Sequence, residues 1–209
     1  YDSNNIAEFA RILIKKGWSI LATEETVSLL KNENIAVEDI KNFTGIENEY
    51  GFPPTLHPRV EYALTDNKCK QRIDIVFDIP YPLGKGIDIG GHTLLGLAIK
   101  GNRTPVIDYD DMVKVVDQIN RNDCISDSTK NDLQEKALVK IINYHNELLQ
   151  LEKSNILYYG VKKIQKLMNG ENPYQIPAFF GIDVSRNISD YSISNFKRVS
   201  GERPCYTNL

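Results

Sequence analysis

The sequence contains few cysteines and histidines, which limits the kinds of site it can hold. Its 209 residues include three cysteines, Cys69, Cys124 and Cys205, which are odd in number and far apart. Neither a disulfide framework nor a paired-cysteine metal site is therefore expected, and three free thiols fit a reducing, cytoplasmic location. The three histidines do not have the spacing typical of metal ligands. We accordingly expect no metal site.

Long apolar runs and a strong excess of one charge are also missing. No stretch approaches the roughly 20 apolar residues that a membrane span needs, and the first residues lack the pattern of a signal peptide. The formal net charge is -3, so neither nucleic acid nor a membrane is expected as a partner. Hydrophobic residues make up 41% and charged residues 25%, as in an ordinary globular protein.

Helical and strand-like segments alternate in the first half of the chain. Apolar spacing predicts helices at residues 6–14, 27–31, 90–100 and 110–119, and β-branched runs predict strands at 18–22, 35–37, 73–79 and 104–108. This alternation implies an α/β fold with a parallel sheet and helices on both faces. Ligands of such folds lie beyond the carboxyl ends of strands. The turns after Ala22, after Ile79 and at residues 87–91 are therefore the expected binding positions.

The second half of the chain is expected to be mainly helical. Ser126 or Asp127 could cap a long helix whose apolar stripe runs from Leu133 to Leu149. A further helix is predicted at about 156–168, followed by loops with short strands. We therefore expect an α/β domain over residues 1–125 and a helical extension over 126–209.

Several short motifs follow one another in an order that resembles a known family. They are EFARILIKKGW at 8–18, TLHP at 55–58, YP at 81–82, IDIGG at 87–91, TLLGLAIK at 93–100 and NGENPYQIPAFF at 169–180. Over nearly the whole chain they resemble the cyclohydrolase half of the PurH-like AICAR transformylase/IMP cyclohydrolases. The first half alone would also fit methylglyoxal synthase and the regulatory domain of carbamoyl-phosphate synthetase, which share the fold.

The resemblance implies a three-layer, methylglyoxal-synthase-like α/β fold with a C-terminal helical extension, in a cytoplasmic homodimer. Residues 201–209 resemble the start of the family's transformylase segment, so we expect a linker toward a transformylase domain that is absent here. In the family, the cyclohydrolase closes the purine ring without metal or cofactor. The carboxamide nitrogen of a formylated aminoimidazole ribotide attacks the formyl carbon, and water then leaves.

The resemblance also assigns roles to individual residues. Asp88 would orient the base and assist proton transfer, Lys100 would stabilise the oxyanion, and Tyr81 would lie near the forming ring. His57 could act in catalysis or could serve as a structural hydrogen-bonding group, and a lysine at a helix end could merely complement the helix dipole. The predicted substrate-binding residues are Thr23, Thr26, Thr55, Ile89, Gly90 and Gly91.

The sequence departs from the family where the 5′-phosphate is expected to bind. The family's Ser/Thr-Gly-Gly-Thr turn reads Thr-Glu-Glu-Thr at 23–26, and Phe52-Pro53-Pro54 replace its Arg-Val-Lys. Each glutamate would repel a phosphate charge at ~5 Å by about 3 kcal/mol at an effective dielectric of ~20. The phosphate site is therefore expected to be altered.

Three functions remain open from the sequence. The first is a cyclohydrolase-type enzyme that closes the ring of a formylated aminoimidazole carboxamide with an altered phosphate site. The second is a divergent ring-closing enzyme for an unphosphorylated substrate. The third is a non-catalytic binding or scaffold domain derived from the cyclohydrolase. In each case the expected ligand is a purine precursor or its analogue, and the expected assembly is a homodimer.

Overall fold

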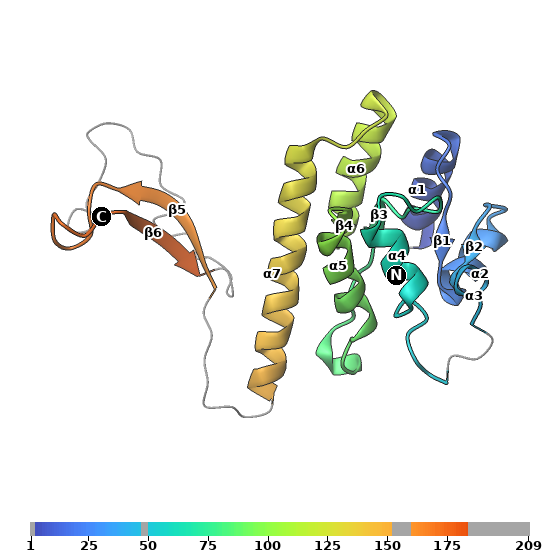
Figure 1. Ribbon diagram of the computed structural model, residues 1–209, viewed down its shortest axis with the longest axis horizontal. Helices are drawn as coiled ribbons and strands as arrows, with labels where there is room; N and C mark the ends of the chain where they lie inside the picture. The colour runs from blue at the N-terminus through green and yellow to red at the C-terminus, as the bar shows by residue number, and fades with distance from the viewer. Residues whose placement is uncertain (1–2, 47–49, 152–159, 184–209) are drawn as a thin grey trace. The chain divides into compact units, whose positions relative to one another are not determined.

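The computed structural model describes residues 3–46, 50–151 and 160–183 (Figure 1). The chain divides into two compact units, residues 1–142 and 143–209, which are described separately below. Within the described ranges, no helix is both long enough and apolar enough to cross a membrane. The predicted boundary after residue 125 and the predicted linker at 201–209 stay predictions, and the linker lies outside the described residues.

The first unit contains helices and short parallel strands. In chain order its elements are α1 (Ser3–Lys15), β1 (Leu21–Ala22), α2 (Glu24–Asn32), β2 (Glu38–Asp39), α3 (Ile40–Thr44), α4 (Pro58–Thr65), β3 (Ile75–Phe77), the 3-10 helix η1 (Leu83–Lys85), α5 (Gly90–Lys100), β4 (Thr104–Val106), α6 (Tyr109–Asn122) and the start of α7 (Asp127–Leu151). Strand β1 pairs with β2 and strand β3 with β4, both in parallel. The mixed α/β class and the parallel pairing are therefore confirmed. A three-layer fold around one continuous parallel sheet stays a prediction, because the described strands of this unit form two separate pairs.

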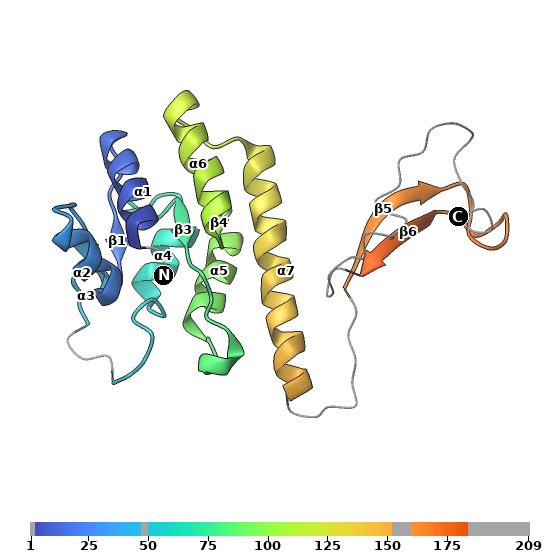
Figure 2. The same ribbon diagram turned by 180° about the vertical axis from the view of Figure 1, so that it is seen from behind.

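Helices pack against both faces of β3. Val76 belongs to a core cluster with α4 and α5, whereas Ile75 and Phe77 pack against a second cluster that includes α1 and α6. Successive residues of a strand point to opposite faces, so this division follows from the strand geometry. Helix α1 contacts α6 and helix α4 contacts α5, as Figure 2 shows from behind. The result is a rigid support for the loop that leaves β3.

Most of the predicted helices of this unit are present, but the strands are shorter than expected. The helix predicted at 90–100 has the same limits as α5. Ser126 caps α7 as expected, since the Thr129 N–H donates to its Oγ at 3.2 Å. The strand predicted at 35–37 was misplaced, because β2 lies at 38–39. Helices α3 and α4 were not predicted, since each is too short to show a full apolar period.

The second unit contains a β-hairpin where a helix was predicted. Strand β5 (Val161–Leu167) pairs in antiparallel orientation with β6 (Ala178–Asp183). The helix predicted at 156–168 was therefore wrong over 161–167, and residues 156–159 lie outside the described part. Apolar residues at 161, 164 and 167 also fit a helical period. Strand β6, with which β5 pairs, begins beyond a connection of ten residues. Pairing with a segment that far away leaves no local signal in the sequence of β5.

Candidate functional site

The candidate site lies in the loop between β3 and α5, and its central residue is Asp88. This side chain is only 6% exposed. One carboxylate oxygen accepts a hydrogen bond from the Gly91 N–H at 2.8 Å, and the other accepts one from the Tyr81 N–H at 3.2 Å. Asp88 thus satisfies a free N–H group of the first turn of α5 and also holds the preceding loop against the helix.

Tyr81 closes the same loop from its other end. Its hydroxyl donates to the Ile87 carbonyl oxygen at 3.1 Å, in addition to the bond from its backbone N–H to Asp88. The loop between them includes η1 and ends at Gly86, whose φ of 117° favours glycine. The structure therefore brings together two of the predicted catalytic residues, Tyr81 and Asp88, in one short hydrogen-bonded loop.

A second carboxylate, that of Asp78, lies beside Asp88 and was not among the predicted site residues. Burial, followed by the negative charge of Asp88, raises the pKa of the Asp78 carboxyl from 3.8 to about 6. Its Oδ2 atom is buried and accepts no hydrogen bond from any described residue. Asp78 is the first residue after β3, and residues just beyond the carboxyl end of a parallel strand often face ligands. Its position directly after a predicted strand was therefore the signal in the sequence from which Asp78 could have been found.

Gly91 allows the two carboxylates to approach the start of α5. A Cβ atom at this position would lie 2.9 and 3.1 Å from the two carboxylate oxygens of Asp88 and would overlap Oδ2 of Asp78. Both carboxylates are therefore packed around the same point of the helix backbone. The predicted ligand-facing role of Gly91 stays a prediction, but the space beside it is occupied by these acidic groups.

Gly90 permits a different close contact, with the segment that precedes α4. A Cβ atom at Gly90 would lie 2.9 Å from Cβ of Pro53 and 3.8 Å from Oγ1 of Thr55. One of the two prolines of the altered segment at 52–54 thus packs on the start of α5. The structure places Thr55, Gly90 and Gly91 in one neighbourhood, as their joint assignment to substrate binding requires.

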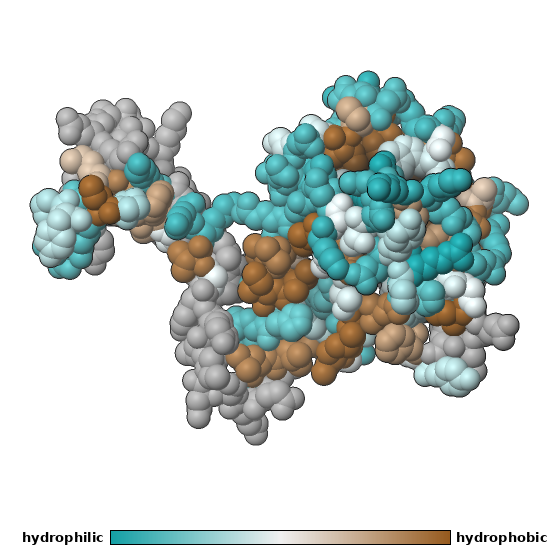
Figure 3. All heavy atoms as spheres, in the orientation of Figure 1, coloured by the Kyte–Doolittle hydropathy of each residue, from teal (hydrophilic) through white to brown (hydrophobic). Residues whose placement is uncertain are grey.

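The rim of this loop is apolar. Its exposed large hydrophobic side chains are Ile79, Tyr81, Ile87 and Ile89, and Lys85 is exposed in the same loop. Figure 3 shows apolar surface in the part of the first unit where η1 and the start of α5 lie in Figure 1. Apolar side chains beside a few polar groups also line many small-molecule sites.

His57 and Lys100 lie in other surroundings. His57 is the N-cap of α4, where its Nδ1 accepts a hydrogen bond from the Arg59 N–H at 3.1 Å. Lys100 is the last residue of α5, and its Nζ lies 2.6 Å from Oε1 of Glu61. Because a helix rises ~1.5 Å per residue, Lys100 lies at the far end of α5 from Asp88. The structure does not bring it to the carboxylate pair.

The start of α2 carries residues 23–26, where the resemblance predicts an altered phosphate site. Thr23 is its N-cap and makes no side-chain capping bond, while Glu24 and Glu25 occupy the first turn. Glu24 forms an ion pair with Lys41 at 2.7 Å. Both glutamates thus belong to the helix turn whose free N–H groups would otherwise favour an anion. Thr26 is half-buried in the same turn.

No group of three or more acidic, histidine or cysteine side chains within the described ranges is arranged to hold a metal ion. Two carboxylates at one helix start, one of them with a pKa near neutrality, can accept and donate protons at neighbouring positions.

Comparison with known proteins gives the family. A sequence model described as the AICARFT/IMPCHase bienzyme matches residues 102–209, which is more than half of the chain. The bifunctional purine biosynthesis protein PurH of Fusobacterium nucleatum is 29% identical over 241 aligned residues, which include 100% of this chain and 47% of that protein. PurH of Clostridium perfringens strain SM101 is 30% identical over 243 residues and is 48% covered. The chain thus spans about half the length of these curated relatives.

A solved structure supports the fold. The crystal structure of ForH superposes with a TM-score of 0.63 at 24% sequence identity, and the match covers 72% of this chain and 94% of ForH. This likeness concerns the fold alone. Together with the match over residues 102–209, the comparisons show that the chain belongs to the AICARFT/IMPCHase bienzyme family.

Proposed function

We propose that this chain carries out a cyclohydrolase-type ring closure on a formylated aminoimidazole carboxamide, in purine biosynthesis or a related pathway. The observation that carries the proposal is the pairing of Asp78 with Asp88 at the start of α5, in a chain of this family. The function of the relatives supports the substrate class, since their names assign them to purine biosynthesis.

The proposed reaction moves two protons from nitrogen to the departing oxygen, and the carboxylate pair can carry both. As the carboxamide nitrogen attacks the formyl carbon, a C–N bond forms, the carbonyl π bond breaks and the nitrogen must lose a proton. Asp88 is the proposed acceptor of that proton, since its carboxylate lies beside that of Asp78 at the start of α5. The alkoxide on the former formyl carbon takes that proton from Asp88 and becomes a hydroxyl group. The hydroxyl group then leaves as water once an acid gives it a second proton.

Asp78 is the proposed acid for the departure of water. Its pKa of about 6 keeps part of the population protonated near neutral pH, where an effective general acid needs its proton. As water leaves, the former formamide nitrogen forms the C=N bond of the ring and gives its N–H proton to the Asp78 carboxylate, so that both carboxyl groups return to their starting states without another reagent. The exposed side chains of Ile79, Ile87 and Ile89 are the proposed contacts for the flat ring.

The roles of four further residues remain proposals. Tyr81 would orient the ring through the loop that it closes, and Thr55 would contact the substrate beside Gly90. Lys100 would stabilise the oxyanion only after leaving Glu61, with which it is paired. His57 would take part only if its Nδ1 gave up the bond that caps α4.

The decisive experiment measures ring closure directly. Formylated aminoimidazole carboxamide ribotide is added, and the absorbance of the purine product is followed. Asp88→Asn and Asp78→Asn should each lower kcat by about 100-fold or more, the usual contribution of a general acid or base. The matched control is Asp132→Asn, because Asp132 is exposed on α7. Absence of turnover by the unaltered chain at high concentration would contradict the enzymatic proposal and favour the non-catalytic domain.

A second candidate substrate is an analogue that lacks the phosphate. The observation that favours it is the presence of Glu24 and Glu25 in the first turn of α2, where a family member is expected to bind phosphate. The riboside is therefore compared with the ribotide under the same conditions. A higher kcat/KM for the riboside would support this alternative, and a higher value for the ribotide would exclude it.

A further inference from the structure

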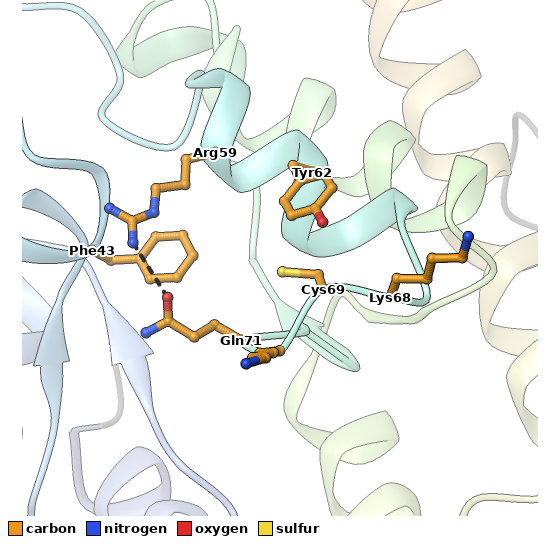
Figure 4. A pocket seen from close by; sticks show the side chains of 7 residues that line it. Phe43, Arg59, Tyr62, Lys68, Cys69 and Gln71 are labelled. Atoms are coloured by element: carbon orange, nitrogen blue, oxygen red, sulfur yellow. Dashed lines mark hydrogen bonds between the residues drawn. The ribbon is translucent and has the colours of Figure 1, made fainter.

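A separate hollow of about 360 Å³ lies beside α4. Figure 4 shows how residues from three parts of the first unit line it: Phe43 from α3, Arg59 and Tyr62 from α4, and Lys68, Cys69, Lys70 and Gln71 from the segment before β3. Residues 68–71 lead into β3, whereas Asp78 leaves it. The hollow and the carboxylate pair therefore lie toward opposite ends of this strand.

The lining is strongly basic although the chain has a net charge of -3. Arg59, Lys68 and Lys70 are exposed, and within the described part of the chain none of them is ion-paired with a carboxylate. Neighbouring cations differ in this respect, since Arg72 is paired with Asp74 at 2.6 Å. Arg59 and Lys70 line one concave surface, and Lys68 points away from the other lining side chains (Figure 4). The positive charge of Arg59 and Lys70 attracts small anions.

Arg59 is held in place from two sides. Its guanidinium carbon lies 5.2 Å from the centroid of the Phe43 ring, and one N–H group donates to Oε1 of Gln71 at 3.4 Å (Figure 4). Phe43 is itself only 4% exposed, so it offers a fixed support. An arginine that is already oriented loses little freedom when its remaining donors bind a planar or tetrahedral oxyanion.

Tyr62 adds an aromatic surface to the basic lining. Its side chain is 49% exposed, and its hydroxyl points toward Cys69 in Figure 4. A tyrosine ring beside arginine and lysine is suited to stack against a flat heterocycle while the cations bind attached charges. The hollow also has the volume of a small-molecule site, for which roughly 300 Å³ is the lower limit.

We propose that this hollow binds a phosphorylated small molecule with a flat ring, of the class of a nucleoside monophosphate, at a site distinct from the carboxylate pair. Arg59 and Lys70 bind the phosphoryl oxygens, and Tyr62 packs against the ring. This proposal does not depend on the ring-closing activity, because it uses none of the residues assigned to that reaction.

The test measures binding of adenosine monophosphate by isothermal titration calorimetry. Arg59→Gln and Lys70→Gln should each weaken binding about tenfold, which corresponds to ~1.4 kcal/mol. Two variants serve as controls: Lys31→Gln removes an exposed lysine on α2, and Asp88→Asn alters the other site. Neither should change the affinity. Adenosine, which lacks the phosphoryl group, should bind more weakly than the monophosphate.

Alkylation of Cys69 gives an independent measurement of occupancy. Cys69 lines the hollow as a half-buried free thiol, and Cys124 is an exposed free thiol outside it. Adenosine monophosphate should slow the reaction of iodoacetamide with Cys69 and leave Cys124 unaffected. The proposal is overturned if there is no binding at millimolar ligand, if adenosine binds equally well, or if only Asp88→Asn weakens binding. Tighter binding of a single-stranded RNA, lost in the same Arg59 and Lys70 variants, would overturn it in favour of a nucleic-acid surface.

Discussion

Replacement of Asp78 by asparagine should stabilise the protein, and the gain should depend on pH. The carboxyl of Asp78 has a pKa of about 6 in the folded chain against an ordinary value of 3.8, because of burial and then of Asp88. The folded state therefore holds this proton more tightly than the unfolded state. Stability associated with Asp78 is present in full below pH ~4 and is lost as the pH rises through about 6. At about 1.4 kcal/mol per pKa unit, the loss amounts to about 3 kcal/mol.

Asparagine has nearly the same shape and no charge to desolvate. Urea denaturation of Asp78→Asn should thus show a free energy of unfolding higher by up to ~3 kcal/mol at pH 7.5, and a difference near zero at pH 4. Asp132→Asn on the exposed face of α7 should change little at either pH. A variant that is less stable at pH 7.5, or a gain that is the same at both pH values, would refute the reasoning. A buried carboxylate that lowers the stability of the folded chain, as Asp78 is expected to do, is typical of a functional group.

The other predictions concern the helix that carries the site and the network beside it. Gly91→Ala should lower the free energy of unfolding by about 1–3 kcal/mol, because the added methyl group overlaps buried carboxylates. On the same helix, a methyl group at Gly96 would have free space, so Gly96→Ala should raise the free energy of unfolding by up to ~1 kcal/mol. If the two variants shifted the melting temperature in the same direction, this pair of predictions would be contradicted. Lys136 is ion-paired with Asp108 and with Asp111, which is 1% exposed. Lys136→Met should therefore cost about 1–3 kcal/mol, measured by urea denaturation at pH 7, and an unchanged midpoint would show that this network is not stabilising.

The sequence predicted the helix of the site well because its signals are local. Two adjacent glycines begin α5, and a regular apolar pattern continues to Lys100, so both limits of the helix could be read directly. Tyr81 and Asp88 were both assigned to the site by the family resemblance, and only a short loop separates them. Local hydrogen bonds within that loop then fix their positions.

The partners of these residues could not be predicted in the same way. Asp78 approaches Asp88 only because the loop folds back on the end of β3, and Pro53 reaches Gly90 from a segment far away in sequence. Lys100 shares a helix with the site, but helix length places it at the opposite end. Side-chain proximity of this kind arises from tertiary packing, which apolar periodicity does not encode. The pairing of β5 with β6 escaped prediction for the same reason.

The pH dependence of ring closure tests the role of the carboxylate pair most directly. The turnover of formylated aminoimidazole carboxamide ribotide is measured from pH 5 to 8 for the unaltered chain and for Asp78→Asn. Since the proposed acid must hold its proton, kcat of the unaltered chain should fall as the pH rises through about 6, the pKa of Asp78. The variant should be at least ~100-fold slower and should lack that decline. Equal rates and the same pH profile in both proteins would contradict the assignment of Asp78 and Asp88 as the proton-transferring pair.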